Sequence, residues 1–190
     1  MSTPPQAPTA RATLDDLART RGKAELIGGR VVPLIPAGVG PGLVAARIFR
    51  SLDDHAEAAG RGVAFTGSIA YAFDELSSGR ESFSPDASYH LGPLPVNGMD
   101  FIGGPPTFAV EVRSEGDYGP AAEIEMAAKR DDYFEAGTLV VWDVDTRAGA
   151  VNAYRTGEPD RPVTFHPGQE ADAEPAVPGW RLDLGRIFRR

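Results

Sequence analysis

The chain has 190 residues, of which 42% are hydrophobic, enough for one globular domain with a hydrophobic core. Its formal net charge of −8, from 27 acidic and 19 basic residues, argues against a protein that coats nucleic acid with a basic surface. It has no cysteine, which excludes disulfides, zinc–thiolate sites and thiol catalysis.

Residues 1–10 are rich in proline and polar side chains, so we expect a flexible tail before a single domain over residues 11–190. This tail lacks the apolar stretch of a secretory signal. No run approaches the roughly 18 apolar residues that a membrane span needs. We therefore expect a cytoplasmic protein without membrane contact.

The first elements expected along the chain are a helix, a hairpin and a longer helix. Thr13 is a typical N-cap for a short helix. Residues 24–34 have the pattern of a hairpin with two glycines at its turn. Residues 43–59 carry apolar side chains at helical spacing, and the helix is expected to end at Gly60.

The rest of the chain alternates strand patterns with one further helix. Strands are expected over residues 63–73, 83–91, 107–113 and 139–144, and a helix over 121–136, closed by Gly137. The strand, helix, strand order from 107 to 144 suits a right-handed crossover between neighbouring strands. The sequence therefore predicts an α/β or α+β domain, with a mixed central sheet flanked by helices and an N-terminal hairpin.

Glu111 is the most informative single residue, because it lies in the apolar run around Val110 and Val112. Strand alternation places it on the face opposite these two valines. A partly buried carboxylate there needs a cation, a metal or hydrogen-bond donors. One alternative is a purely structural ion pair with Arg113.

Asp86, Glu25 and Lys129 are less informative alone. Asp86 follows a proline and is typical of a turn, and Glu25 has the pattern of an exposed acid on an edge strand. Helical spacing places Lys129 on the same side as Tyr133, where it can reach a cleft, or it pairs with Glu125 one turn earlier. Taken together, two strand carboxylates and a lysine suit magnesium-dependent cleavage of phosphodiesters.

The order and spacing of four segments resemble the Uma-type restriction endonuclease family, within the PD-(D/E)XK nuclease superfamily. The segments are AELIGGRVV (24–32), SPD (84–86), AVEVRS (109–114) and KRDDYFEAG (129–137). The resemblance covers nearly the whole chain. It implies a restriction-endonuclease-like fold, an endonuclease acting on nucleic acid, with DNA expected, and a homodimer.

The resemblance also implies roles for individual residues. Asp86 and Glu111 would bind Mg²⁺ or Mn²⁺, and Glu25 would support them. Lys129 would take the place of the superfamily lysine, which normally stands where this chain has Arg113. Arginine is bulkier and keeps its proton, so Arg113 is expected to contact a phosphate. Tyr133 is expected to brace Lys129.

Two other functions remain open at the level of sequence. The net negative charge and Arg113 in place of a lysine favour a catalytically silent interaction protein that keeps the nuclease fold. A structural β-rich domain, with Glu111 and Arg113 as a buried ion pair, is the third alternative.

Overall fold

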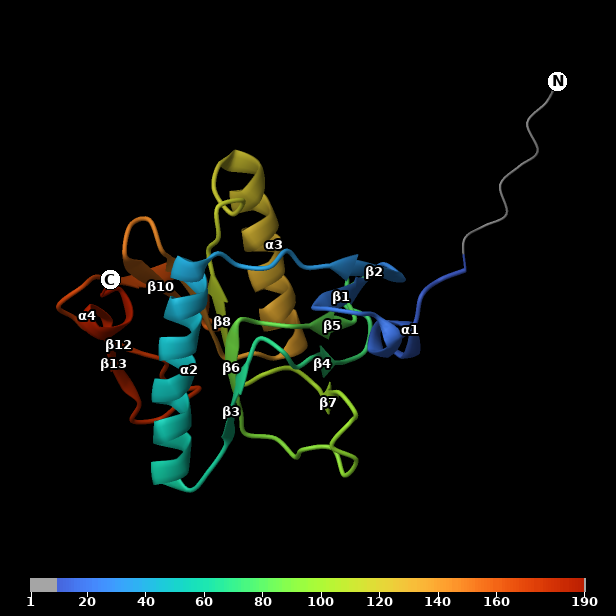
Figure 1. Ribbon diagram of the computed structural model, residues 1–190, viewed down its shortest axis with the longest axis horizontal. Helices are drawn as coiled ribbons and strands as arrows, with labels where there is room; N and C mark the ends of the chain where they lie inside the picture. Colours follow the sequence, from blue (N-terminus) through green and yellow to red (C-terminus); the bar gives the residue numbers. More distant parts are fainter. Residues whose placement is uncertain (1–9, 190) are drawn as a thin grey trace.

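The computed structural model describes residues 10–189 (Figure 1). All of the expected flexible tail except Ala10 lies outside this range, so the division into a tail and a single domain stays a prediction. Within the described part of the chain, no helix is long and apolar enough to cross a membrane.

A mixed six-stranded sheet forms the centre of the fold. Its strands, in spatial order, are β11 (Glu158–Phe165), β10 (Ala150–Arg155), β9 (Val140–Asp145), β8 (Phe108–Val112), β6 (Ala87–His90) and β3 (Val63–Thr66). Neighbouring β8 and β9 are parallel and the other pairs are antiparallel. The predicted α+β architecture, with a mixed central sheet flanked by helices, is confirmed.

Helices and small sheets surround this centre. The helices are α1 (Leu14–Arg19), α2 (Val39–Ala59), α3 (Pro120–Ala136) and α4 (Leu184–Ile187). The short strands form the hairpin β1 (Ala24–Ile27) and β2 (Arg30–Pro33), the sheet β5 (Ser82–Phe83), β4 (Tyr71–Ala72) and β7 (Ile102–Gly103), and the pair β12 (Glu170–Asp172) and β13 (Arg181–Asp183). In Figure 1, α2 and α3 lie on either side of β8.

The helix boundaries follow the expected signals closely. Thr13 caps α1 in a reciprocal capping box with Asp16. Helix α2 ends at Gly60, which has the left-handed φ of 62°. It begins at Val39 and not at residue 43, because Pro41 falls in the first turn, where a missing N–H leaves no hydrogen bond unmade.

Two predicted strands are interrupted, and one interruption positions the site. The strand expected over 63–73 is split into β3 and β4, and that over 83–91 into β5 and β6. Between β5 and β6, Pro85 has no N–H to contribute to a ladder. The next N–H, that of Asp86, donates to the carbonyl of Val110, which anchors Asp86 beside β8.

Each face of the sheet has its own core. The larger core holds α2, the C-terminal segment and one side of β8, including Phe108, Val110 and Val112. On the other face, Ala109 of β8 packs with Tyr133 of α3. The predicted alternation along β8 is therefore confirmed, and Glu111 is directed to the α3 side.

Candidate active site

The structure brings Glu25, Asp86, Glu111 and Lys129 together from four separate segments. Glu25 comes from β1, Asp86 from the turn before β6, Glu111 from β8 and Lys129 from α3. They meet on the α3 side of the central sheet. These four residues form the candidate site.

Lys129 joins two of the carboxylates. Its Nζ lies 3.1 Å from Oε1 of Glu25 and 2.9 Å from Oε1 of Glu111. The hydroxyl of Tyr133, one turn further along α3, donates to the same Glu111 oxygen at 2.6 Å. Lys129 thus pairs across the fold with acids of β1 and β8, and not with Glu125 on its own helix. Tyr133 braces the acid that Lys129 contacts.

Asp86 lies beside Glu111 with both of its oxygens in use. Oδ1 is 2.8 Å from Nζ of Lys23, and Oδ2 accepts the N–H of Val112 at 2.9 Å. The Lys23 and Asp86 side chains keep 28% and 27% of their surface exposed, so solvent and solutes reach this pair. Gly67 packs against this pair of side chains, and a Cβ at position 67 would lie 3.2 Å from Nζ of Lys23.

Glu25 is the buried centre of a wider ionic network. Only 2% of it is exposed, and it is held by the Arg80 guanidinium, by Lys129 and by the N–H of Ser84 at 3.0 Å. Arg80 also donates to Asp132 of α3 at 2.7 Å. Because Glu25 is buried, it positions Lys129, whereas the side chains of Asp86 and Glu111 keep 27% and 23% of their surface exposed and are the accessible acids.

Burial and neighbouring charges tune these groups in opposite directions. Burial raises the pKa of Glu111, and Asp86 and Glu25 add to this rise while Lys129 partly offsets it. Burial acts the same way on Glu25, but Lys129 and Arg80 outweigh it and lower its pKa. Burial opposes the charge of Lys129, yet Glu111 and Glu25 outweigh it and raise its pKa. Lys129 is therefore a fixed cation at neutral pH and does not serve as a base.

Arg113 has a different environment from the one expected. Its guanidinium makes a two-pronged pair with Asp143, at 2.7 Å for each prong, and also contacts Glu123 of α3. Its side chain is only 8% exposed. Arg113 therefore ties α3 to β9. The alternative ion pair of Arg113 with Glu111 does not form among residues 10–189, where Glu111 pairs with Lys129. Its role as a phosphate contact stays a prediction that this pairing does not favour.

Sequence reasoning missed Lys23 and Arg80 as members of the site. Both pair with acids far along the chain, across 63 residues for Lys23–Asp86 and 55 for Arg80–Glu25. Lys23 stands two positions before Glu25 in the hairpin segment, and that proximity was the available signal. Arg80 lies in a polar loop with no pattern of its own.

Comparison with known proteins places the chain in a family. Residues 11–185 match the Uma2 family, described as "Putative restriction endonuclease". The chain belongs to the Uma2 family. Among solved structures, a crystal structure described as "a putative nuclease belonging to DUF820 from Anabaena variabilis" is similar, with a TM-score of 0.70 and 18% identity over 93% of this chain and 97% of that one. At that identity the likeness concerns the fold. No protein with a curated description matches.

The donor atoms of the candidate site are of the kind that a hard divalent cation binds. Asp86 and Glu111 supply carboxylate oxygens, and Oε2 of Glu111 has no hydrogen-bond partner among the described residues. The described residues contain no group of three or more acids or histidines spaced to hold a metal. Two carboxylates suit Mg²⁺, which commonly keeps water and substrate oxygens as its remaining ligands.

Proposed function

We propose that the protein is a metal-dependent endonuclease that hydrolyses phosphodiester bonds of DNA, acting as a homodimer in the cytoplasm. The observation that carries the proposal is the double contact of Lys129 with Glu25 and Glu111, beside the half-buried Asp86. Membership of the Uma2 family and the nuclease-like fold support it.

Asp86 and Glu111 would hold Mg²⁺ or Mn²⁺, and the bound ion would supply Lewis-acid activation of water and of the phosphate. Lys129 contributes a permanent positive charge beside Glu111, which stabilises negative charge that develops on the phosphate. Glu25 holds Lys129 in place from its buried position. Tyr133 fixes the carboxylate of Glu111 in one orientation.

Substitution of Asp86 by Asn tests this proposal. The amide oxygen can still accept the Val112 N–H, so the fold should persist while the ligand charge is lost. We expect Mg²⁺ binding by calorimetry to disappear, and cleavage of supercoiled and single-stranded DNA to fall by about 10²-fold or more. Asp160→Asn, at an exposed position on β11, is the matched control. Unchanged cleavage by the Asp86 variant would sink the mechanism.

A second candidate is a catalytically silent interaction protein with the same fold. The observation in its favour is that Lys23 and Lys129 already neutralise Asp86 and Glu111. It predicts no heat on Mg²⁺ titration of the wild-type protein and no cleavage of DNA or RNA. Measurable Mg²⁺ binding that depends on Asp86 would decide against it.

A further inference from the structure

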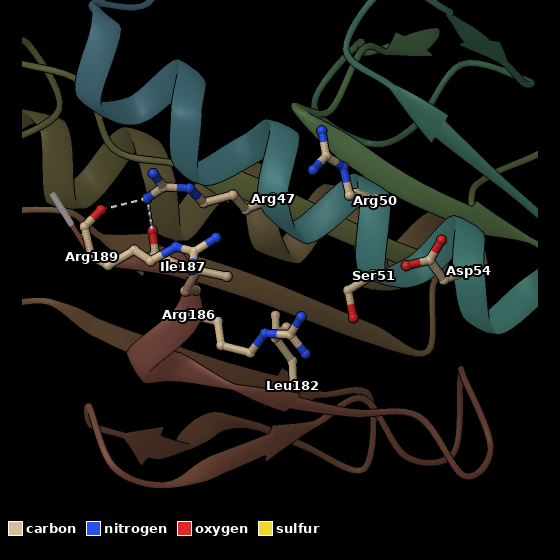
Figure 2. A pocket seen from close by; sticks show the side chains of 8 residues that line it. All are labelled: Arg47, Arg50, Ser51, Asp54, Leu182, Arg186, Ile187 and Arg189. Atoms are coloured by element: carbon tan, nitrogen blue, oxygen red, sulfur yellow. Dashed lines mark hydrogen bonds between the residues drawn. The ribbon is translucent and has the colours of Figure 1, made fainter.

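A small hollow lies between α2 and the C-terminal segment (Figure 2). Its volume is about 100 Å³, and eight residues line it: Arg47, Arg50, Ser51, Asp54, Leu182, Arg186, Ile187 and Arg189. Leu182 and Ile187 belong to the core on the α2 face of the sheet. The hollow is thus separated from the candidate active site by the central sheet.

The charge of this hollow opposes that of the chain. Its lining has four arginines and one acid, Asp54, whereas the whole protein has a net charge of −8. Within residues 10–189, none of these four arginines forms a salt bridge. Four cations against one carboxylate leave the hollow with an excess of positive charge, and this arrangement favours an anion as a further partner.

One arginine organises the hollow and the others face solvent. Nη1 of Arg47 donates to the carbonyls of Ile187 at 2.8 Å and Arg189 at 2.6 Å, which fixes the chain after α4. Figure 2 shows the side chains of Arg186 and Arg189 in the space between this segment and α2, whereas Arg50 is directed away from them. Arg186 and Arg189 are exposed, and their guanidinium groups have donors to spare.

Ser51 adds a neutral donor at the same place. Its Oγ accepts the indole N–H of Trp180 at 3.1 Å, which leaves its own O–H to donate elsewhere. Forked guanidinium groups with a hydroxyl match the oxygens of a tetrahedral oxyanion. A hollow of this size suits a single compact anion and not a base or an extended chain.

We propose that this hollow binds a phosphate group, with Arg186 and Arg189 as its principal ligands and Ser51 and Arg47 beside them. The phosphate can come from inorganic phosphate or from the 5′ end of a nucleic acid, since both present the same oxygens. The Uma2 match ends at residue 185, so Arg186 and Arg189 lie beyond the part of the chain that the family defines.

The test is a titration of the full chain with inorganic phosphate, without divalent metal, followed by calorimetry and tryptophan fluorescence. Trp180 is a natural fluorescence reporter because its indole N–H donates a hydrogen bond to Ser51. The double substitution Arg186→Gln and Arg189→Gln should weaken phosphate binding at least tenfold. Arg47 is left intact, since it holds the C-terminal segment. The matched control, Arg30→Gln with Arg161→Gln, removes two exposed arginines elsewhere and should change the Kd less than twofold.

A second arm distinguishes the two sources of phosphate. A short oligonucleotide with a 5′-phosphate is compared with the same oligonucleotide ending in a 5′-hydroxyl, on an Asp86→Asn background that removes the proposed nuclease site from the measurement. Tighter binding of the phosphorylated form, lost in the Arg186 and Arg189 variant, identifies a nucleic-acid end. Binding of inorganic phosphate alone identifies the free ion. Absence of phosphate binding, or equal binding by the double variant and the wild type, overturns the proposal.

Discussion

At the scale of the residue, Lys129 decides how the candidate site holds together. Among residues 10–189, it is the single side chain that forms salt bridges with acids of both β1 and β8. Its raised pKa, maintained by Glu111 and Glu25 against the effect of burial, keeps it charged. Removal of this charge should therefore affect catalysis and the positions of both carboxylates.

We expect Lys129→Met to lower the rate of DNA cleavage by about 10²- to 10³-fold, because one preorganised cation is lost from the reacting centre. Single-turnover cleavage at saturating Mg²⁺ measures the change. Lys129→Arg keeps the charge in a bulkier, planar form and should retain more activity than Met. A folded Met variant that cleaves within threefold of the wild-type rate would contradict the role given to Lys129.

Glu25 offers a prediction about stability and pH. Glu25→Gln should lower the free energy of unfolding at pH 7 by about 3–5 kcal/mol, because buried Arg80 and Lys129 lose a charged partner. The pKa of Glu25 is lowered in the folded state, so this contribution is full above the ordinary glutamate value of about 4.5 and is lost as the pH falls through the lowered pKa. Urea unfolding at several pH values should show the gap between the two proteins narrowing only below about pH 4.5.

The control for this experiment is Glu57→Gln, at an exposed position of α2, which should change stability by less than about 0.5 kcal/mol. A gap between the wild type and Glu25→Gln that widens on acidification would contradict the assignment, since it requires a raised pKa.

At the scale of the element, α3 positions the ammonium group of Lys129 beside Glu25 and Glu111. Helix α3 connects the parallel strands β8 and β9 along the chain. It ends at Gly137, which has a φ of 108°. Few residues other than glycine adopt that conformation, and it turns the chain into β9. The pair of Arg113 with Asp143 and Glu123 fastens the first turn of α3 to the sheet.

Gly137→Ala should therefore destabilise the protein by about 1–2 kcal/mol, through strain in the left-handed region. Space is not the cause, because the nearest atom to a new Cβ, Cγ of Pro105, is 3.7 Å away. Thermal unfolding measures the effect. Gly116→Ala serves as the comparison, since its φ lies outside that region and nothing stands within 4 Å of a new Cβ. Equal effects of the two substitutions would show that backbone conformation is not the cause.

Sequence patterns revealed those parts of the fold and site that depend on neighbours in the chain. The alternation of side chains along β8 predicted which face of the sheet Glu111 lies on. The four-residue spacing on α3 predicted that Lys129 and Tyr133 lie on the same side of the helix. The contacts of Lys23 and Arg80 could not be predicted, because they depend on how β1 and the loop before β5 pack against the sheet. Strand β11 was also missed, since it is an exposed edge with two prolines and no alternation.

At the scale of the whole molecule, the two faces of the sheet carry different kinds of contact. The α2 face carries the larger core. The ring centroid of Trp142 lies 5.0 Å from that of Trp180 and 5.2 Å from that of Phe108. The α3 face carries the ionic network. A loss of packing in the α2-face core should therefore lower stability without changing the proposed metal site on the α3 face.

Trp180→Ala tests this separation. Trp180 is 2% exposed, so its truncation should lower the free energy of unfolding by about 3–5 kcal/mol. Mg²⁺ binding at Asp86 and Glu111 should change less than twofold in the protein that remains folded. Chemical denaturation and calorimetry measure the two quantities. Trp180→Phe keeps an aromatic ring and should recover part of the stability. A large loss of Mg²⁺ affinity in the folded Ala variant would contradict the separation.

Because Lys129 lies on helix α3, its position depends on how that helix is held against the sheet. Position 113 is occupied by an arginine that fastens α3 to the sheet, and that same helix delivers Lys129. A lysine at position 113 would lose the two-pronged pair with Asp143 and so weaken the attachment of α3, the helix that holds Lys129 in place. We therefore expect Arg113→Lys alone to weaken the attachment of α3 and not to substitute for Lys129.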